Sequence, residues 1–180
     1  MFNGIIYKTG SIFKVIKGNN YSEVVLKSNY EFKKSEIGSS LSCNGTCLTI
    51  TSIQKKYVTF YLSKETLQRT TFRFAKIGDL INIEKSLSHG DKISGHYVQG
   101  HVDTTGHVLD IKIIDKTWIV TFKTSKAHKK YLIEKGSISI NGVSLTISMI
   151  RNDTFQINII PHTLKLTNLK KLKKNDLVNI

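Results

Sequence analysis

The chain contains two copies of one sequence pattern, and this duplication limits its possible folds more than any other feature. Three blocks of the first half return in the second half at an offset of 97 residues: Gly45–Ile50 as Gly142–Ile147, Glu65–Leu67 as His162–Leu164, and Gly78–Ile83 as Asn175–Ile180. A constant offset across separate blocks indicates a tandem duplication, and this period is far longer than that of a solenoid repeat. We therefore predict an N-terminal domain over residues 1–96 and a C-terminal domain over residues 97–180.

Short β-strands dominate the local pattern of both copies. The segments Tyr57–Leu62, Trp118–Phe122 and Thr154–Ile159 are rich in aromatic and β-branched residues that partly alternate with polar ones. This composition predicts strands. Asn-Gly pairs at 44–45 and 141–142 predict tight hairpin turns between further strands.

Helical spacing is confined to two short stretches, Ser63–Arg69 and Ser125–Glu134. In the second of these, Ser125 is a plausible N-cap of a surface helix. Many short strands in such a small domain favour barrel closure, because closure removes exposed strand edges. We predict an all-β chain of two similar small antiparallel Greek-key barrels with short helices.

Composition and cysteine usage argue against export. No run approaches the roughly 18 apolar residues of a membrane-spanning helix, and the N-terminus does not resemble a signal peptide. If Cys43 and Cys47 shared one extended strand, their backbones would lie about 13 Å apart, too far for a disulfide. A reducing, cytoplasmic location and no membrane partner are therefore expected.

The net charge of +14 raises the question of nucleic-acid binding. Only three of the 27 basic residues are arginine, the better residue for bidentate phosphate contacts, and the lysines are scattered. A barrel for single strands would also need aromatic platforms flanked by basic residues, and only one tryptophan is present. We expect no nucleic-acid partner. The one dense cluster, Lys170–Lys174, is interpreted as a solvated loop, with an anion-binding patch as the alternative.

Chemically active side chains are distributed unequally between the copies. Four aligned positions differ in this way: Ile5 and His101, Cys47 and Ser144, Lys64 and Pro161, Glu65 and His162. Two like sites with unequal chemistry would suit an enzyme that handles two similar molecules in different roles. Taken alone, Cys47 has the alternative of being a small core residue.

Histidine chemistry divides between metal binding and acid–base work. His96 and His101 have no third ligand in a suitable motif, so we expect no metal. His101 is instead expected to act as a hydrogen-bonding or acid–base group, because the pKa of histidine lies near neutrality.

Six motifs resemble those of the riboflavin synthase alpha-chain family, in order and over residues 1–180: Met1–Ile6 (MFNGII), Asn44–Thr49 (NGTCLT), Lys64–Leu67 (KETL), Gly95–Asp103 (GHYVQGHVD), Asn141–Thr146 (NGVSLT) and Ile160–Leu164 (IPHTL). The resemblance implies two lumazine-binding repeats and a cofactor-free transferase. Two molecules of 6,7-dimethyl-8-ribityllumazine would bind face to face, and a four-carbon unit would pass from one to the other. The products implied are riboflavin and 5-amino-6-(D-ribitylamino)uracil, in the last step of riboflavin biosynthesis.

The resemblance also implies where each lumazine binds. One site is expected to hold Gly4, Ile5, Ile6, Cys47, Leu48 and Thr49, closed by Tyr61, Leu62, Ser63, Lys64, Glu65 and Thr66. The other is expected to hold Gly100, His101, Val102, Lys135, Ser144, Leu145 and Thr146, with Asn158, Ile159, Ile160, Pro161, His162 and Thr163. For catalysis we expect a proton acceptor, or a nucleophile adding at C7, from Cys47, His101, Ser144 and His162. Hydroxide or a ribityl hydroxyl is the alternative nucleophile.

The same resemblance implies a homotrimer with sites shared between subunits, and a possible association with lumazine synthase. The family's C-terminal helix, which assembles the trimer, has no counterpart up to Ile180. The expected consequences are trimerisation through other surfaces, a weaker assembly or an incomplete site. The alternative function is a non-catalytic lumazine- or flavin-binding protein of the same fold.

Overall fold

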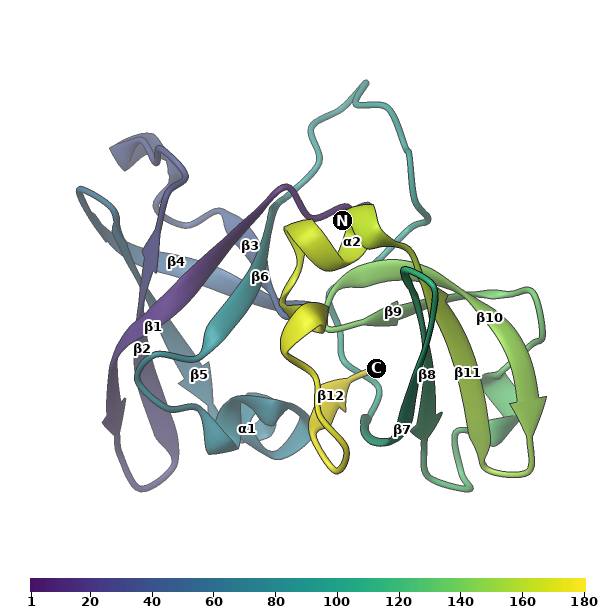
Figure 1. The fold of residues 1–180 in the computed structure, drawn as a ribbon. Coiled ribbons are helices and arrows are strands. Elements are labelled where there is room, and N and C mark those ends of the chain that lie inside the picture. The colour runs from purple at the N-terminus through teal and green to yellow at the C-terminus, as the bar shows by residue number, and fades with distance from the viewer.

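Each repeat folds into six antiparallel strands, and the two units lie side by side in the computed structural model, which describes residues 1–180 (Figure 1). The first repeat contains β1 (Lys8–Lys17), β2 (Tyr21–Ser28), β3 (Ser40–Cys43), β4 (Thr46–Gln54), β5 (Tyr57–Ser63), α1 (Lys64–Arg69) and β6 (Leu80–Lys85), with 3₁₀ turns η1 (Lys34–Glu36) and η2 (Thr71–Phe74). The second contains β7 (Thr105–Ile114), β8 (Thr117–Lys123), β9 (Ser137–Ile140), β10 (Val143–Arg151), β11 (Thr154–Ile159), α2 (Pro161–Leu166) and β12 (Leu177–Asn179), with η3 (Lys129–Tyr131) and η4 (Asn168–Lys171). The three predicted strands and the all-β class are confirmed.

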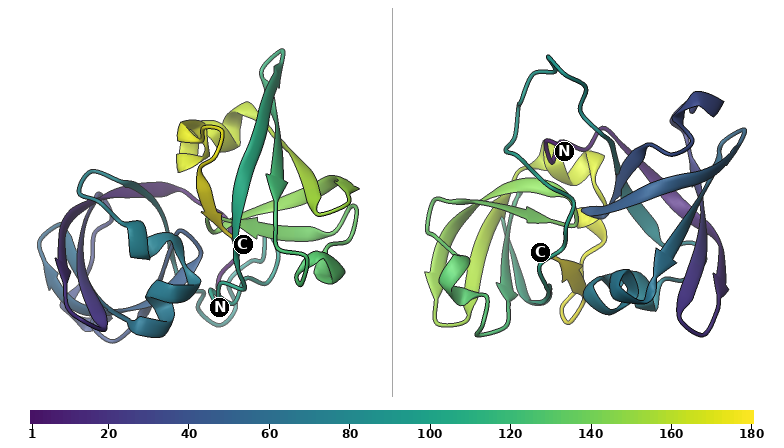
Figure 2. Two further views of the ribbon diagram at one scale, coloured as in Figure 1. Left: turned by 90° about the horizontal axis from the view of Figure 1, so that it is seen from below. Right: turned by 180° about the vertical axis from the view of Figure 1, so that it is seen from behind.

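The first repeat forms a closed barrel in the order β1-β2-β5-β4-β3-β6. Seen from below, its strands form a ring (left panel of Figure 2), and their inward side chains form a buried core. The second repeat has the equivalent order, β12-β7-β8-β11-β10-β9, as a strongly curved six-stranded sheet. Its two edge strands meet at one backbone hydrogen bond, from Asn141 N to Asn179 O at 3.0 Å. The second unit is thus barrel-like, with the outer edge of β9 left largely unpaired.

The duplication extends to local irregularities of the backbone. The first strand of each repeat shifts register once, after Ile12 in β1 and after Val108 in β7. The fourth strand of each repeat does so after Ile50 in β4 and after Ile147 in β10. Bulges of this kind increase strand bending, which a small barrel needs in order to curve. The same solution to curvature is therefore used twice.

The two hairpin turns predicted from Asn-Gly pairs are also confirmed. Asn44 and Gly45 have φ values of 48° and 79°, and Asn141 and Gly142 have 47° and 79°. Two positive φ values in succession are what a twisted two-residue hairpin requires. The turns meet where the two barrels contact each other, because the Gly45 and Gly142 backbones lie within van der Waals distance.

A buried asparagine cluster joins the barrels at these turns. Asn82 N donates to Asn44 Oδ1 at 2.8 Å, and its repeat equivalent Asn179 N donates to Asn141 Oδ1 at 2.9 Å. The side chains then cross between the repeats. Asn82 Nδ2 donates to Asn141 O at 2.9 Å, and Asn179 Nδ2 donates to Asn44 O at 2.8 Å. These reciprocal bonds satisfy buried polar groups and fix the relative position of the barrels.

One position of this cluster breaks the symmetry. Asn168 and its equivalent Thr71 both donate a backbone N–H to the cluster, at 2.7 Å to Asn82 Oδ1 and at 2.8 Å to Asn179 Oδ1. Only the asparagine adds a side chain: Asn168 Nδ2 donates to Asn44 Oδ1 at 2.9 Å, and Asn168 Oδ1 accepts from Asn82 Nδ2 at 2.8 Å. Asn168 is therefore the most connected link between the repeats.

The helix predictions have mixed outcomes. Ser63 caps α1 by accepting from Thr66 N, so the first prediction is confirmed. The second is wrong, because residues 125–134 contain only the 3₁₀ turn η3. Ser125 Oγ bonds to the His128 ring at 2.6 Å instead of capping a helix. The segment has no apolar stripe wide enough to hold a longer helix on the barrel. No helix of the structure has the length and apolar character needed to span a membrane.

The cysteine geometry also differs from the prediction. Cys43 ends β3 and Cys47 lies in β4, on opposite sides of the Asn44–Gly45 turn instead of on one strand. Both are free thiols. Burial raises the pKa of the Cys43 thiol, so that this side chain is an inert core residue.

Candidate active site

The segments that precede the two barrels pair with each other and then cross to the opposite repeat. Phe2 and Val98 form an isolated antiparallel bridge, with N–H to O distances of 2.8 and 3.0 Å. Beyond this bridge, Ser144 N donates to Gly4 O at 2.7 Å, and Cys47 N donates to Gly100 O at 2.7 Å. Each repeat's leading segment therefore lies against the Cys/Ser strand of the other repeat.

Both crossing points require glycine. Gly4 and Gly100 have φ values of +71° and +83°, which strain any residue with a Cβ. A Cβ on Gly4 would lie 2.8 Å from that of Ser144, and one on Gly100 would lie 2.7 Å from that of Cys47. The shared glycines of the two copies thus serve this close approach.

This arrangement corrects the expected grouping of site residues. Gly4, Ile5 and Ile6 were expected beside Cys47, but Gly4 contacts Ser144 and Ile6 is buried in the core of the second barrel. Gly100 was expected beside Ser144 and instead contacts Cys47. The chain crosses before β1 and β7 begin, so each leading segment completes the other repeat's site.

We therefore define two half-sites. The Cys47 half-site comprises Cys47, Leu48, Thr49, Tyr61–Thr66 and Gly100–Val102. The Ser144 half-site comprises Gly4–Ile6, Lys135, Ser144–Thr146 and Asn158–Thr163.

Within the half-sites, exposure separates side chains that can meet a ligand from those that cannot. Leu48, Leu62 and Ile159 are buried in the barrel cores and can offer a ligand only their backbone. Tyr61, with 53% exposure, stacks on Tyr21 with ring centroids 5.1 Å apart. Glu65, at the start of α1, is paired with Arg69 at 2.8 Å on the surface.

The two histidines among the predicted catalytic residues belong to different half-sites. His162 is exposed in the first turn of α2, and His101 is exposed beside the Gly100 crossing. Neither ring makes a hydrogen bond within the chain. Their placement leaves both free to meet a ligand, without any internal group that would orient them.

A histidine outside the expected site residues, His96, contacts the Ser144 half-site. His96 Nδ1 is 2.7 Å from Ser144 Oγ, and His96 N donates to Asn3 O at 3.2 Å. The ring is half-buried, and burial lowers its pKa. The repeat comparison did not predict this contact, because His96 has no equivalent residue in the other copy.

Glu84, at the end of β6, was also not predicted. Its carboxylate accepts from Asn3 N at 2.7 Å and from Gly4 N at 3.0 Å. Burial raises the pKa of this carboxyl group, and the amide donors act in the opposite direction. Glu84 thereby holds the leading segment of the first repeat where it meets Ser144.

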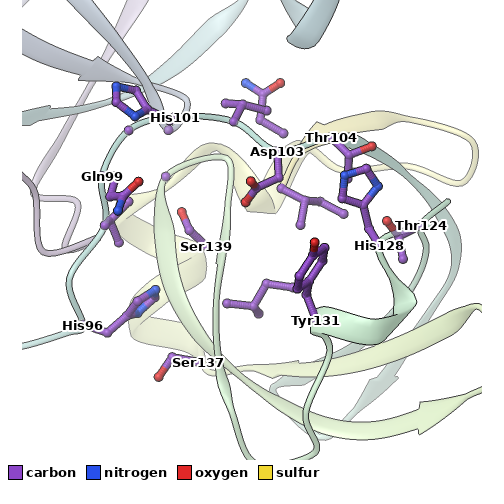
Figure 3. A pocket seen from close by; sticks show the side chains of 18 of the residues that line it. His96, Gln99, His101, Asp103, Thr104, Thr124, His128, Tyr131, Ser137 and Ser139 are labelled. Carbon is purple, nitrogen blue, oxygen red and sulfur yellow. The ribbon is translucent and has the colours of Figure 1, made fainter. Parts of the chain in front are cut away.

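A hollow of about 760 Å³ opens between the barrels, lined by residues 96–104, β9 and the loop around η3 (Figure 3). It contains the rings of His96, His101, His128 and Tyr131. Of the expected site residues, however, only Gly100–Val102 line it. The hollow thus borders the Cys47 half-site without containing it, and we assign the candidate chemistry to the half-sites because the repeat differences concentrate there.

Comparison with known proteins identifies the class. The lumazine-binding domain family matches the chain twice, over residues 3–86 and 99–180. Structures of LumP bound to flavin mononucleotide and to riboflavin superimpose with TM-scores of 0.86 and 0.87, at 27% and 28% identity, covering 99% of this chain and 97% of each of theirs. The chain therefore consists of two barrel-like lumazine-binding domains in tandem.

Sequence relatives identify the family within this class of lumazine-binding proteins. Riboflavin synthases of Actinobacillus pleuropneumoniae, Photobacterium leiognathi and Escherichia coli (strain K12) are 35%, 38% and 36% identical, over the whole of this chain and 84%, 83% and 85% of their own lengths. The chain belongs to the riboflavin synthase family and is a transferase.

Proposed function

We propose that the chain converts two molecules of 6,7-dimethyl-8-ribityllumazine into riboflavin and 5-amino-6-(D-ribitylamino)uracil by transfer of a four-carbon unit. The observation that carries the proposal is the pair of half-sites with the same backbone geometry and different chemistry. Cys47 and Ser144 each donate a backbone N–H at 2.7 Å to a crossing glycine, yet only Ser144 has a histidine on its side chain. Equivalent backbones suit two copies of one substrate, and unequal side chains suit two roles.

Positioning supplies much of the expected rate acceleration. Two lumazine rings held in register react as if in one molecule, and such orientation is worth about 7–11 kcal/mol in well-aligned systems. The 7-methyl protons are acidic through conjugation with the ring, so a neutral side-chain base is sufficient. The proposal assigns the donor and acceptor lumazines to the two half-sites, brought together between neighbouring subunits.

A second candidate is a binding protein without turnover. It is favoured by the similarity to LumP, whose structures hold flavin mononucleotide, riboflavin or 6,7-dimethyl-8-(1'-D-ribityl) lumazine. Incubating the purified chain with a large excess of the lumazine and recording riboflavin fluorescence separates the two. Synthesis predicts one riboflavin per two lumazines over many equivalents of protein. Binding that saturates without riboflavin formation would reject synthesis and leave the binding function.

Assembly and location remain predictions. A homotrimer would bring the two half-sites of neighbouring chains together, and light scattering on the fraction that forms riboflavin measures it. Association with lumazine synthase is inferred from the family resemblance, and a cytoplasmic location is inferred from composition and cysteine usage.

A further inference from the structure

The side chains of Cys47 and Ser144 differ in their surroundings as well as in their own chemistry. The thiol of Cys47 has no hydrogen-bond partner within the chain, whereas Ser144 Oγ lies 2.7 Å from His96 Nδ1. Cys47 and Ser144 occupy equivalent positions of the two repeats, so their surroundings can be compared directly. His96 therefore adds to the chemical difference between the half-sites.

His96 is held in place from several directions. Its backbone donates to Asn3 O, and the amides of Asn3 and Gly4 are themselves bound by the Glu84 carboxylate. Gly4 O in turn accepts from Ser144 N. Asn3 and Gly4 therefore link the His96 backbone to the Ser144 backbone. This chain of hydrogen bonds keeps the imidazole against the Ser144 hydroxyl.

The electrostatics favour a neutral ring. His96 is half-buried, burial lowers its pKa, and no acidic side chain is hydrogen-bonded to it. A neutral imidazole protonated at Nε2 has a free lone pair at Nδ1, which accepts from the Ser144 hydroxyl. This arrangement can receive a proton delivered through the serine, as in a nucleophile–base pair.

We propose that Ser144 and His96 form the proton-accepting pair that deprotonates the 7-methyl group of the lumazine in the Ser144 half-site. This rests on the proposed function. The methyl C–H bond breaks and its proton bonds to Ser144 Oγ, while the hydroxyl proton passes to His96 Nδ1. The electron pair stays on the exocyclic carbon, delocalised into the pteridine ring. The products are neutral serine, an imidazolium and the lumazine anion, so the Ser144 half-site supplies the carbon nucleophile.

The test follows the methyl protons themselves. Exchange of the 7-methyl protons of 6,7-dimethyl-8-ribityllumazine for deuterium is recorded by proton NMR in D₂O, with and without protein. Ser144→Ala and His96→Gln are expected to lower the protein-dependent exchange rate by about 10²-fold or more, the range for loss of a general base. A fluorescence titration with the same lumazine shows that each variant still folds and binds.

The chain offers a matched control. Ser125 Oγ and His128 Nδ1 form a similar pair at 2.6 Å, outside both half-sites. Ser125→Ala and His128→Gln are expected to leave exchange unchanged. Retained exchange in His96→Gln would overturn the assignment. Loss of exchange in Cys47→Ala would then place the base in the other half-site.

The outcomes separate the two proposals. Wild-type protein that exchanges the methyl protons through His96 without forming riboflavin would refute synthesis and support the proton-accepting pair. Riboflavin formation with exchange unaffected in His96→Gln and Ser144→Ala would support synthesis and refute the pair.

Discussion

Replacing Asn168 by alanine removes three wholly or partly buried hydrogen bonds that join the second repeat to the first. Asn168 Nδ2 donates to Asn44 Oδ1 and to Leu80 O, both at 2.9 Å, and Asn168 Oδ1 accepts from Asn82 Nδ2 at 2.8 Å. The backbone bond from Asn168 N to the cluster survives the change. At about 1 kcal/mol net for each buried bond, the free energy of unfolding should fall by about 3 kcal/mol.

The assay is urea denaturation followed by the fluorescence of Trp118, the single tryptophan, and by far-ultraviolet circular dichroism. With a slope of about 2–3 kcal/mol per molar urea, the midpoint should fall by about 1–1.5 M. Thr71→Ala is the matched control, because Thr71 occupies the equivalent position and joins the cluster only through its backbone N–H. Its midpoint should barely move. Equal effects of the two substitutions would refute the claim that the Asn168 side chain links the barrels.

Two further predictions concern strain and charge at the site. Lys135 has a φ of +66° where its repeat equivalent Gly38 has +89°, so Lys135→Gly should raise the free energy of unfolding by about 0.5–1 kcal/mol. A lower value in urea titration would contradict the strain. Because burial raises the pKa of Glu84, its contribution to stability is present at low pH and is lost as the pH rises through that pKa. The amide NMR signals of Asn3 and Gly4 should therefore titrate with a midpoint above that of an ordinary glutamate, and Glu84→Gln should abolish this titration; a midpoint below it would contradict the assignment.

The sequence predicted the parts of the fold that depend on local pattern. Strands and Asn-Gly turns depend on residues that are close together in the sequence. The constant offset between the copies then allowed each assignment in one copy to be made in the other. The prediction of a surface helix at 125–134 was wrong, because a mixture of polar and apolar residues does not by itself provide a continuous apolar face to bury.

The site was predicted less completely, for a physical reason. A repeat shows which residues are equivalent, but not which copy each one contacts, so the crossing of Gly4 and Gly100 was invisible. His96 was missed because its contact with Ser144 spans the two repeats, and Glu84 was missed because its bonds to Asn3 N and Gly4 N join opposite ends of the first repeat. The roles of His96 and Glu84 follow from the three-dimensional positions of the two leading segments.

Each half-site is built from both repeats, and the reactivity of Cys47 is a direct test of this crossed arrangement. Cys43 is only 1% exposed, so a thiol reagent should label Cys47 alone in the folded chain. Gly100→Ala and Gly4→Ala introduce the same strain at equivalent positions, but only the methyl at 100 would press on Cys47. We expect Gly100→Ala to change the labelling rate of Cys47 several-fold, because the crossed arrangement places Gly100 against this residue. Gly4→Ala should leave the rate within about twofold. The reverse pattern would contradict the crossed arrangement and the half-sites that depend on it.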